Sequence, residues 1–308
     1  MILIFSIDGD ESTNAVIDLL QSAKYKRINK IALSNSITIN DSESYTISAF
    51  VDLINDAKCY YFRKKPLVIS ETQSAQVSHI QKSEFLQIIE YVLYTNNMKP
   101  RLGSWNQDSI NRLIVSNLAK VNNLLVPFDS FISSKQEIVE LEKSKNIRFI
   151  TKNISFSAPQ QVNQDVYNPL TSIVDSEQVP STFFPSYVQE FIHKEFDIRS
   201  FYLDGEFYST AIFSQNESET SVDYRNYNYE VPARQIRYKL PDKIDQNVKR
   251  LCKSLGLNTG SIDFVKDLNS DNIYFLEINP SGQFGSLSYT GNYNIEGIIA
   301  NWLITRDE

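Results

Sequence analysis

The feature that most constrains this chain is a pair of β-like runs near its C-terminus that carry oxygen-bearing side chains. The first run covers residues 260–265 and contains Asp263, and the second covers residues 274–280 and contains Glu277 and Asn279. The stretch between them is rich in Asn, Asp and Ser, whose side chains hydrogen-bond the local backbone in turns. The sequence therefore predicts an antiparallel hairpin that places Asp263 opposite Glu277.

The predicted hairpin would gather three oxygen ligands. Because side chains alternate along a strand, Glu277 and Asn279 share one face and meet Asp263 there. Two carboxylates about 4 Å apart would repel each other by roughly 4 kcal/mol at an effective dielectric constant near 20. A strand pair holds such groups only if a cation binds there or one carboxyl is protonated. A few hard oxygen ligands suit Mg²⁺ that is also held by substrate phosphates, so the hairpin indicates a nucleotide-using enzyme.

Bulk properties narrow the class of protein further. The 308 residues allow two or three domains, and 42% hydrophobic with 22% charged residues is typical of a globular chain. A net charge of −7 argues against a general nucleic-acid binder. Cys59 and Cys252 are far apart and form no Cys-x-x-Cys pair, so we expect neither a disulfide framework nor a zinc site. Without a signal peptide or an apolar run of about 20 residues, we expect a cytoplasmic protein and no membrane partner.

Hydrophobic periodicity predicts the secondary structure in outline. Residues 1–7 and the helix after them indicate an α/β start, and Pro100 and Gly103 mark a domain boundary. The Asp204-Gly205 dipeptide between two apolar runs predicts a β-hairpin. Further strands are expected at 147–154, 185–192, 196–203 and 206–214, and helices from about 12, at 84–95, 108–122, 242–255 and 292–303.

The order of motifs resembles the ATP-grasp fold over about residues 100–308, and the N-terminal third only in outline. The motifs, in chain order, are Lys152, the Gln189–Ile192 strand, Asp197 with Arg199, Asp204-Gly205, the run from Leu255 to Asp263, and Glu277 to Pro280. Within that superfamily the chain is similar to the peptide-maturing ligases of graspetide pathways, and most to the grasp-with-spasm and microviridin types. The diagnostic string is residues 275–285, Phe-Leu-Glu-Ile-Asn-Pro-Ser-Gly-Gln-Phe-Gly.

The resemblance implies a fold class and a domain organisation. It implies an α/β (α+β) protein with an N-terminal α/β domain at 1–103, a smaller central domain at 104–184 and a C-terminal antiparallel-sheet domain at 185–308. ATP would bind between the last two domains.

The resemblance also implies roles for individual residues. Asp263, Glu277 and Asn279 would bind the Mg²⁺ ions that bridge the ATP phosphates. Arg199 and Arg234 would be catalytic and face the transferred phosphate or the acyl substrate. The nucleotide-binding set would be Lys152 on the phosphates, and Gln189, Glu190, Phe191 and Ile192 around the adenine and ribose.

Two departures from the family pattern are visible. Residues 153–166 contain no glycine, although many ATP-grasp enzymes have a glycine-rich loop there. A second phosphate-binding lysine is also missing, and Arg112 stands at its approximate place. Taken singly, the site residues have ordinary structural interpretations as well, with Asp263 as a turn residue and Arg199 as the ion-pair partner of Asp197.

The activity implied by the resemblance is ATP-dependent macrocyclisation of a ribosomal precursor peptide. The peptide would carry a leader and a core rich in Ser, Thr, Asp and Glu, and its carboxyl groups would be joined to hydroxyls or amines. A homodimer is also expected from the family. The alternatives are a ligase that adds glutamate or a similar residue to a protein or small molecule, and a non-catalytic nucleotide-binding regulator.

Overall fold

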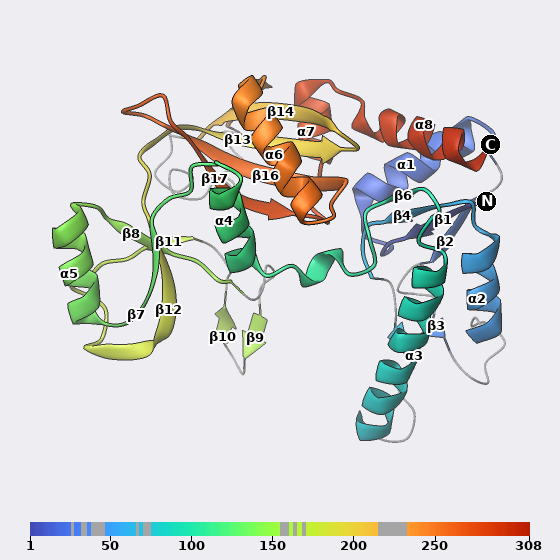
Figure 1. The fold of residues 1–308 in the computed structure, drawn as a ribbon, viewed down its shortest axis with the longest axis horizontal. Coiled ribbons are helices and arrows are strands. Elements are labelled where there is room, and N and C mark those ends of the chain that lie inside the picture. The colour runs from blue at the N-terminus through green and yellow to red at the C-terminus, as the bar shows by residue number, and fades with distance from the viewer. Residues whose placement is uncertain are drawn as a thin grey trace.

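The computed structural model describes the helices and strands of three successive parts of the chain (Figure 1). The described residues are 1–25, 28–31, 36–37, 47–65, 68–69, 75–154, 160–162, 165–167, 171–214 and 233–308. Each part is built around its own sheet, parallel in the first part and antiparallel in the other two. The mixture of parallel and antiparallel sheets with helices is that of the expected α/β (α+β) class.

The N-terminal part is a parallel sheet with the strand order β2-β1-β4-β6. Every residue of its strands β1 and β4 is buried, as expected when helices cover both faces of a parallel sheet. A small parallel pair, β3 with β5, accompanies the sheet. The elements are β1 (Ile2–Phe5), α1 (Glu11–Ser22), β2 (Ile28–Ile31), β3 (Ser36–Ile37), α2 (Ile47–Asp56), β4 (Cys59–Phe62), β5 (Val68–Ile69), α3 (Ala75–Thr95) and β6 (Arg101–Leu102).

The central part is an antiparallel sheet with the order β11-β8-β12-β7, and one helix covers one of its faces. Ile138 of that helix, α5, packs with Ile132, Phe149 and Val188 of the strands in a small core. The elements are η1 (Gln107–Ser109), α4 (Arg112–Val121), β7 (Asp129–Ser134), α5 (Lys135–Lys145), β8 (Phe149–Thr151), the β9 (Gln160–Val162) and β10 (Asp165–Tyr167) pair, β11 (Ser172–Ile173) and β12 (Thr182–Glu190).

The C-terminal part is a five-stranded antiparallel sheet with the order β15-β14-β13-β16-β17. One face packs on α4 and α6, where Ile198 and Tyr202 join the core. The opposite face carries Phe201 and Leu203, which pack with α7 and α8. The elements are β13 (Lys194–Leu203), β14 (Glu206–Phe213), β15 (Arg234–Arg237), α6 (Asp242–Ser254), β16 (Thr259–Asp267), β17 (Ile273–Asn279), α7 (Gly285–Gly291) and α8 (Ile295–Asp307).

The N-terminal and C-terminal parts share a hydrophobic core. Ile2 and Ile4 of β1 and Val16 of α1 belong to the same buried cluster as Phe201 and Phe284. In Figure 1, α8 lies beside α1 over the N-terminal sheet, and the two termini are close together. The first and last segments of the chain therefore form one packed unit.

Most expected elements are confirmed, with shifted ends. The Asp204-Gly205 hairpin forms with Leu203 opposite Glu206, and both turn residues have positive φ, at 47° and 104°. The helix expected at 84–95 starts earlier, at Ala75, and the one expected at 108–122 is preceded by a separate 3-10 turn. Helix α7 is not among the expected elements, and its short span has glycine at both ends.

The structure suggests a different boundary between the central and C-terminal domains from 184/185. Strand β12 pairs with β7 and β8 as far as Glu190, so it belongs to the central sheet throughout. Helix α4 packs in the core of the C-terminal sheet although it precedes β7 in the chain. We therefore propose to place this boundary in the segment that joins β12 to β13.

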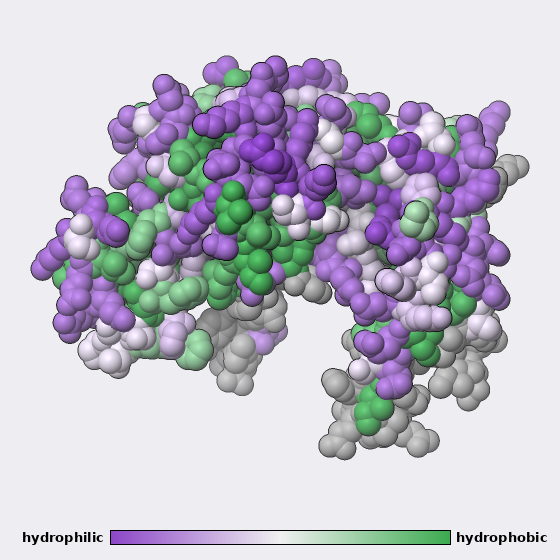
Figure 2. All heavy atoms as spheres, viewed as in Figure 1, coloured by the Kyte–Doolittle hydropathy of each residue, from purple (hydrophilic) through white to green (hydrophobic). Residues whose placement is uncertain are grey.

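Among the described residues, no helix is long and apolar enough to cross a membrane. Apolar side chains gather over α4 and the segment after it, which is visible at the centre of Figure 2. Ile114, Val121 and Leu125 are each about half exposed or more there, at 57%, 69% and 49%.

Candidate active site

The hairpin predicted from the sequence forms, and its register is the expected one. Asp263 of β16 lies opposite Glu277 of β17, and Ser261 lies opposite Asn279. A β-bulge follows, because Phe264 pairs with Phe275 and Leu276 is left out of the pairing. The bulge lets Phe275 and Ile278 both reach the core on the α4 and α6 face. Glu277 and Asn279 are thereby left, half-buried, on the other face.

Two arginines lie against the paired carboxylates. Arg199 of β13 is directly opposite Asp263, and its Nη1 lies 3.4 Å from Asp263 Oδ1. Arg112 at the start of α4 places its Nη1 3.9 Å from Glu277 Oε2. The four side chains are 13–30% exposed, so their charges are partly screened by solvent. Arg–carboxylate–carboxylate–Arg is a balanced row, in which each cation offsets the repulsion between the two anions.

Asp197 lies on the same strand as Arg199, but the described ion pair of Arg199 is with Asp263. Asp197 is buried and is instead held by Lys194, 2.8 Å away, and by Ser214, whose Oγ donates to it at 2.7 Å. The simple ion pair considered for Arg199 is thus formed with another carboxylate, Asp263. The guanidinium is instead directed toward the predicted metal ligand Asp263.

The donor chemistry of the row fits Mg²⁺. Asp263 and Glu277 offer carboxylate oxygens, and Asn279 adds an amide oxygen two residues along the same strand. That oxygen also accepts a hydrogen bond of 3.1 Å from the Ser281 backbone N–H. Within the described part of the chain, no group of three or more His, Cys, Asp or Glu side chains could hold a metal. The set therefore suits an ion that takes one or two carboxylates and obtains its other ligands from phosphates and water.

The residues expected to bind the nucleotide lie at the junction of the central and C-terminal sheets. Lys152 follows directly after β8, outside the strand to which the sequence assigned it. Arg112 donates to the carbonyl of Asn153 at 3.3 Å as well as facing Glu277. This arginine therefore ties the end of β8 to the carboxylate row.

Strand β12 divides the other nucleotide-binding candidates between two faces. Gln189 is buried, and its amide donates to the Tyr187 hydroxyl at 3.2 Å. Its Oε1 has no hydrogen-bond partner among the residues that the structure describes. On the opposite face, the Glu190 carboxylate accepts from the Phe128 N–H at 3.1 Å. The unsatisfied Gln189 oxygen is a buried acceptor that an amino group such as that of adenine could satisfy.

Glu190, Phe191 and Ile192 line one pocket of about 430 Å³. Its other walls come from the end of α5, from His193 and from the hairpin around Asp267 and Tyr274. Arg148 lies 5.8 Å from the centre of the Phe191 ring, and His193 packs edge-on against the same ring at 4.9 Å. The structure thus brings three of the predicted residues together beside the segment that joins the two sheets.

Comparison with solved structures identifies the fold. The macrocyclase MdnC from Microcystis aeruginosa, bound with its precursor peptide, superposes with a TM-score of 0.73 at 20% identity over 99% of each chain. A RiPP-associated ATP-grasp ligase from Chryseobacterium gregarium gives 0.76 at 18% identity, over 100% of this chain and 98% of that one. The ATP-grasp ligase PsnB gives 0.70 at 14% identity, over 100% and 97%. No protein-family model and no curated relative matches the sequence.

The chain has the fold of these ATP-grasp proteins. The likeness extends over all three parts of the chain, including the N-terminal third that the sequence matched only in outline. In this chain, the paired carboxylates Asp263 and Glu277 lie on β16 and β17 of the C-terminal sheet. The nucleotide-binding candidates lie beside the central sheet.

Arg234 is not brought to the row in this ATP-grasp sheet. It lies opposite Phe213, on the face that Phe196 and Ile198 share, with its guanidinium 5.6 Å from the Phe213 ring. Arg237 lies opposite Thr210, which is itself opposite Arg199, so Arg237 shares the face of the row. Arg237 donates to the carbonyls of Gly291 and Asn292 and therefore holds the end of α7. The catalytic role expected of Arg234 stays a prediction without support from the register.

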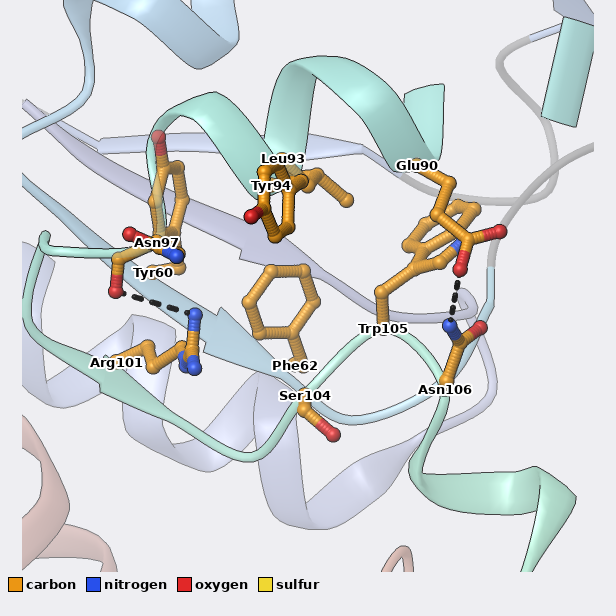
Figure 3. A pocket seen from close by; sticks show the side chains of 10 residues that line it. All are labelled: Tyr60, Phe62, Glu90, Leu93, Tyr94, Asn97, Arg101, Ser104, Trp105 and Asn106. Carbon is orange, nitrogen blue, oxygen red and sulfur yellow. Dashed lines mark hydrogen bonds between the residues drawn. The ribbon is translucent and has the colours of Figure 1, made fainter. Parts of the chain in front are cut away.

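A second pocket lies wholly within the N-terminal part of the fold (Figure 3). It measures about 260 Å³ and is lined by aromatic residues that include Tyr60, Tyr94 and Trp105. Its charged groups bind neighbours, since Glu90 accepts from Asn106 at 2.8 Å and Arg101 donates to the Asn97 carbonyl at 3.4 Å. None of the predicted site residues lines this pocket.

Proposed function

We propose that this protein is an ATP-dependent carboxylate ligase that forms macrocyclic ester or amide links in a ribosomally made precursor peptide. The observation that carries the proposal is the row Arg199–Asp263–Glu277–Arg112 in an ATP-grasp fold. Three solved relatives of that fold are described as complexes with precursor peptides, and two of the PsnB complexes also contain Mg and ADP.

The proposed reaction needs activation, because a hydroxyl cannot displace oxide from a carboxylate. Transfer of the ATP γ-phosphoryl group to an Asp or Glu side chain of the peptide gives an acyl phosphate, and ADP leaves. A Ser or Thr hydroxyl, or a Lys amine, then attacks the acyl carbon and phosphate departs. Each link therefore consumes one ATP and removes the equivalent of one water from the peptide.

Residues of the chain have separate tasks in this proposal. Asp263, Glu277 and Asn279 hold Mg²⁺, which would neutralise charge on the transferring phosphoryl group. Arg199 is a permanently charged, planar donor that can bind a carboxylate or phosphate oxygen in two-point fashion. Lys152 contacts phosphate at the end of β8.

The adenine site belongs to the same proposal. The unsatisfied oxygen of Gln189 and the backbone of Phe191 and Ile192 are offered to the base, next to the segment that joins the two sheets. We also propose that the protein is cytoplasmic and forms a homodimer. Light scattering of the purified protein tests whether it is a dimer.

The stoichiometry of the reaction tests the proposed function. Purified protein would be incubated with Mg²⁺, ATP and a peptide rich in Ser, Thr, Asp and Glu that is encoded beside it. The proposal predicts one ADP and one phosphate released for each water lost from the peptide mass. A gain in peptide mass would favour the amino-acid ligase instead, and no Mg²⁺-dependent nucleotide turnover would favour the non-catalytic regulator.

A further inference from the structure

The turn that follows β17 is held on one side by residues of the N-terminal part of the fold and by η1. This turn, residues 281–284, begins immediately after Asn279 and Pro280. The Ser281 hydroxyl accepts a hydrogen bond of 3.1 Å from Gln107 and donates to Asp108. At the next residue, the Gly282 carbonyl accepts from Arg63 Nη1 at 3.2 Å.

Gln283 in the turn is bound through both ends of its side-chain amide. Its Nε2 donates to Asp10 Oδ1 at 3.2 Å, and its Oε1 accepts from the Ser12 hydroxyl at 2.7 Å. Asp10 and Ser12 are buried residues at the start of α1. The side chain of Gln283 therefore fastens the turn to the N-terminal sheet and helix.

Asp10 and Arg63 form an ion pair from which water is excluded. Both side chains are 0% exposed, and Arg63 Nε lies 3.5 Å from Asp10 Oδ2. Burial raises the pKa of Asp10, but the Arg63 charge and hydrogen bonds, including that from Thr13, outweigh burial and lower it overall. Asp10 therefore accepts the hydrogen bond from Gln283 as an ionised carboxylate. The guanidinium of Arg63 also lies 5.2 Å from the centre of the Phe284 ring.

The other side of the same turn holds the candidate active site. The Gln283 backbone carbonyl accepts from Arg199 Nη2 at 3.2 Å and from the Ser261 hydroxyl at 3.0 Å. The Ser281 N–H donates to the Asn279 side-chain oxygen at 3.1 Å. One catalytic candidate and one metal-ligand candidate are thus oriented by a turn that N-terminal residues fix.

Stability alone is a poor reason for this arrangement. A buried ion pair is often no more stabilising than apolar residues of similar volume, because desolvation offsets the attraction between the charges. In the part of the chain that the structure describes, Nε and Nη2 of Arg63 also have no hydrogen-bond partner. If the Asp10–Arg63 pair fixes the geometry of the neighbouring site, this role explains why the pair is kept despite its desolvation cost. It also explains why the pair lies against the 281–284 turn.

We propose that Asp10, Ser12 and Arg63, acting through Gln283 and the 281–284 turn, are positioning residues that set Arg199 and Asn279 for the acyl-transfer chemistry. The proposal rests on the proposed function. It makes the N-terminal domain part of the machinery that aligns the site, although none of these N-terminal residues is proposed to touch the reacting atoms.

The first test is the variant Gln283→Met, which keeps the side-chain volume and removes both amide hydrogen bonds. We expect kcat for peptide dehydration to fall on the order of 10- to 100-fold, because a shift of about 1 Å in a catalytic group costs that much. KM for ATP should change by less than about threefold, since the binding of the adenine is not altered. The matched control is Gln136→Met, an exposed glutamine on α5 that donates to Glu140 at 2.7 Å.

A double-mutant cycle separates positioning from general damage. If the turn acts through Arg199, Gln283→Met should lower kcat by less than about threefold when Arg199→Lys is already present. Equal effects in both backgrounds, or a Gln283→Met enzyme as active as the Gln136→Met control, would overturn the proposal. The paired variant Asp10→Asn with Arg63→Met removes both charges together, so it should fold with a similar melting temperature and still lose kcat.

Failure of the proposed function would be distinguishable from failure of this inference. A wild-type protein that leaves peptide mass unchanged would refute the proposed function. The turn would then be judged by the Mg²⁺ concentration needed for half-maximal binding of ATP. A higher requirement in Gln283→Met than in Gln136→Met would support the positioning of Asn279, and an equal requirement would refute it.

Discussion

A methyl group added at Gly282 should damage the candidate site without touching any of its charged side chains. A Cβ built on Gly282 would collide with the Ser261 side chain, with its Oγ only 2.6 Å away, and would lie 3.0 Å from the Asn279 carbonyl oxygen. Ordinary non-bonded contacts lie at about 3.5–4.0 Å, so the turn must move by about 1 Å in Gly282→Ala. The turn carries the Gln283 carbonyl that holds Arg199, so the movement reaches the carboxylate row.

Two magnitudes follow for Gly282→Ala. Overpacking of this kind costs about 1–3 kcal/mol, and the reduced freedom of the unfolded chain returns about 0.4–1 kcal/mol of it. We therefore expect a net loss of about 1–2 kcal/mol in the free energy of unfolding, measured by urea denaturation. A displacement of about 1 Å should lower kcat by on the order of 100-fold.

The companion change Ser261→Gly tests the cause of the damage. It removes the Cβ and Oγ that the new methyl would meet, so Gly282→Ala with Ser261→Gly should be more stable than the sum of the single changes predicts. Activity should return only in part, because the hydrogen bond from Ser261 to Gln283 is also lost. If Gly282→Ala alone matches the wild type in stability and kcat, the reasoning from close packing is refuted.

Three further predictions concern the rest of the chain. Gly205→Ala should lower the free energy of unfolding by about 1 kcal/mol through its φ of 104°, with kcat unchanged, and an unaltered urea midpoint would contradict this. Because the pKa of Asp10 is lowered, its contribution to stability is complete above pH 3.8 and is lost as pH falls through its folded-state value. The free energy of unfolding should therefore fall less steeply with decreasing pH in Asp10→Asn than in the wild type. An equally steep fall in the two proteins would contradict this prediction. Burial raises the pKa of Cys252 to about 12 and that of Cys59 to about 11. Iodoacetamide at about pH 8 should therefore label these thiols only after the protein unfolds. Rapid labelling of the folded protein would refute this prediction.

Local signals in the sequence accounted for the hairpins because their information lies within a few residues. The Asp204-Gly205 turn and the Asn- and Asp-rich stretch before Ile273 each specify a reversal, and strand alternation then predicts which residues face each other. The opposition of Asp263 and Glu277 could be predicted in this way. The bulge at Leu276 could not, since it is set by packing of Phe275 and Ile278 against α4 and α6.

The parts that escaped sequence reasoning depend on contacts between distant segments. Asp10 meets Gln283, and Arg63 meets Gly282, because the segments after β1 and β4 lie beside the 281–284 turn in the folded chain. Arg112 reaches Glu277 because α4 packs beside β17. The early start of α3 was not predicted because residues 76–84 are mostly polar and contain only two apolar side chains, Val77 and Ile80. Two apolar residues are too few to show a helical period.

The metal-ligand candidates Asp263, Glu277 and Asn279 are proposed to support ligase chemistry on a peptide. The most direct measurement is the intact mass of the Ser/Thr- and Asp/Glu-rich peptide that is encoded beside this chain. The peptide would be co-expressed in turn with the wild-type protein, with the Glu277→Gln variant and with the exposed control variant Glu206→Gln. We expect loss of one or more waters with the wild type and with Glu206→Gln, and none with Glu277→Gln. Water loss that persists in Glu277→Gln would contradict the assigned site, and an unchanged mass with the wild type would contradict the proposed activity.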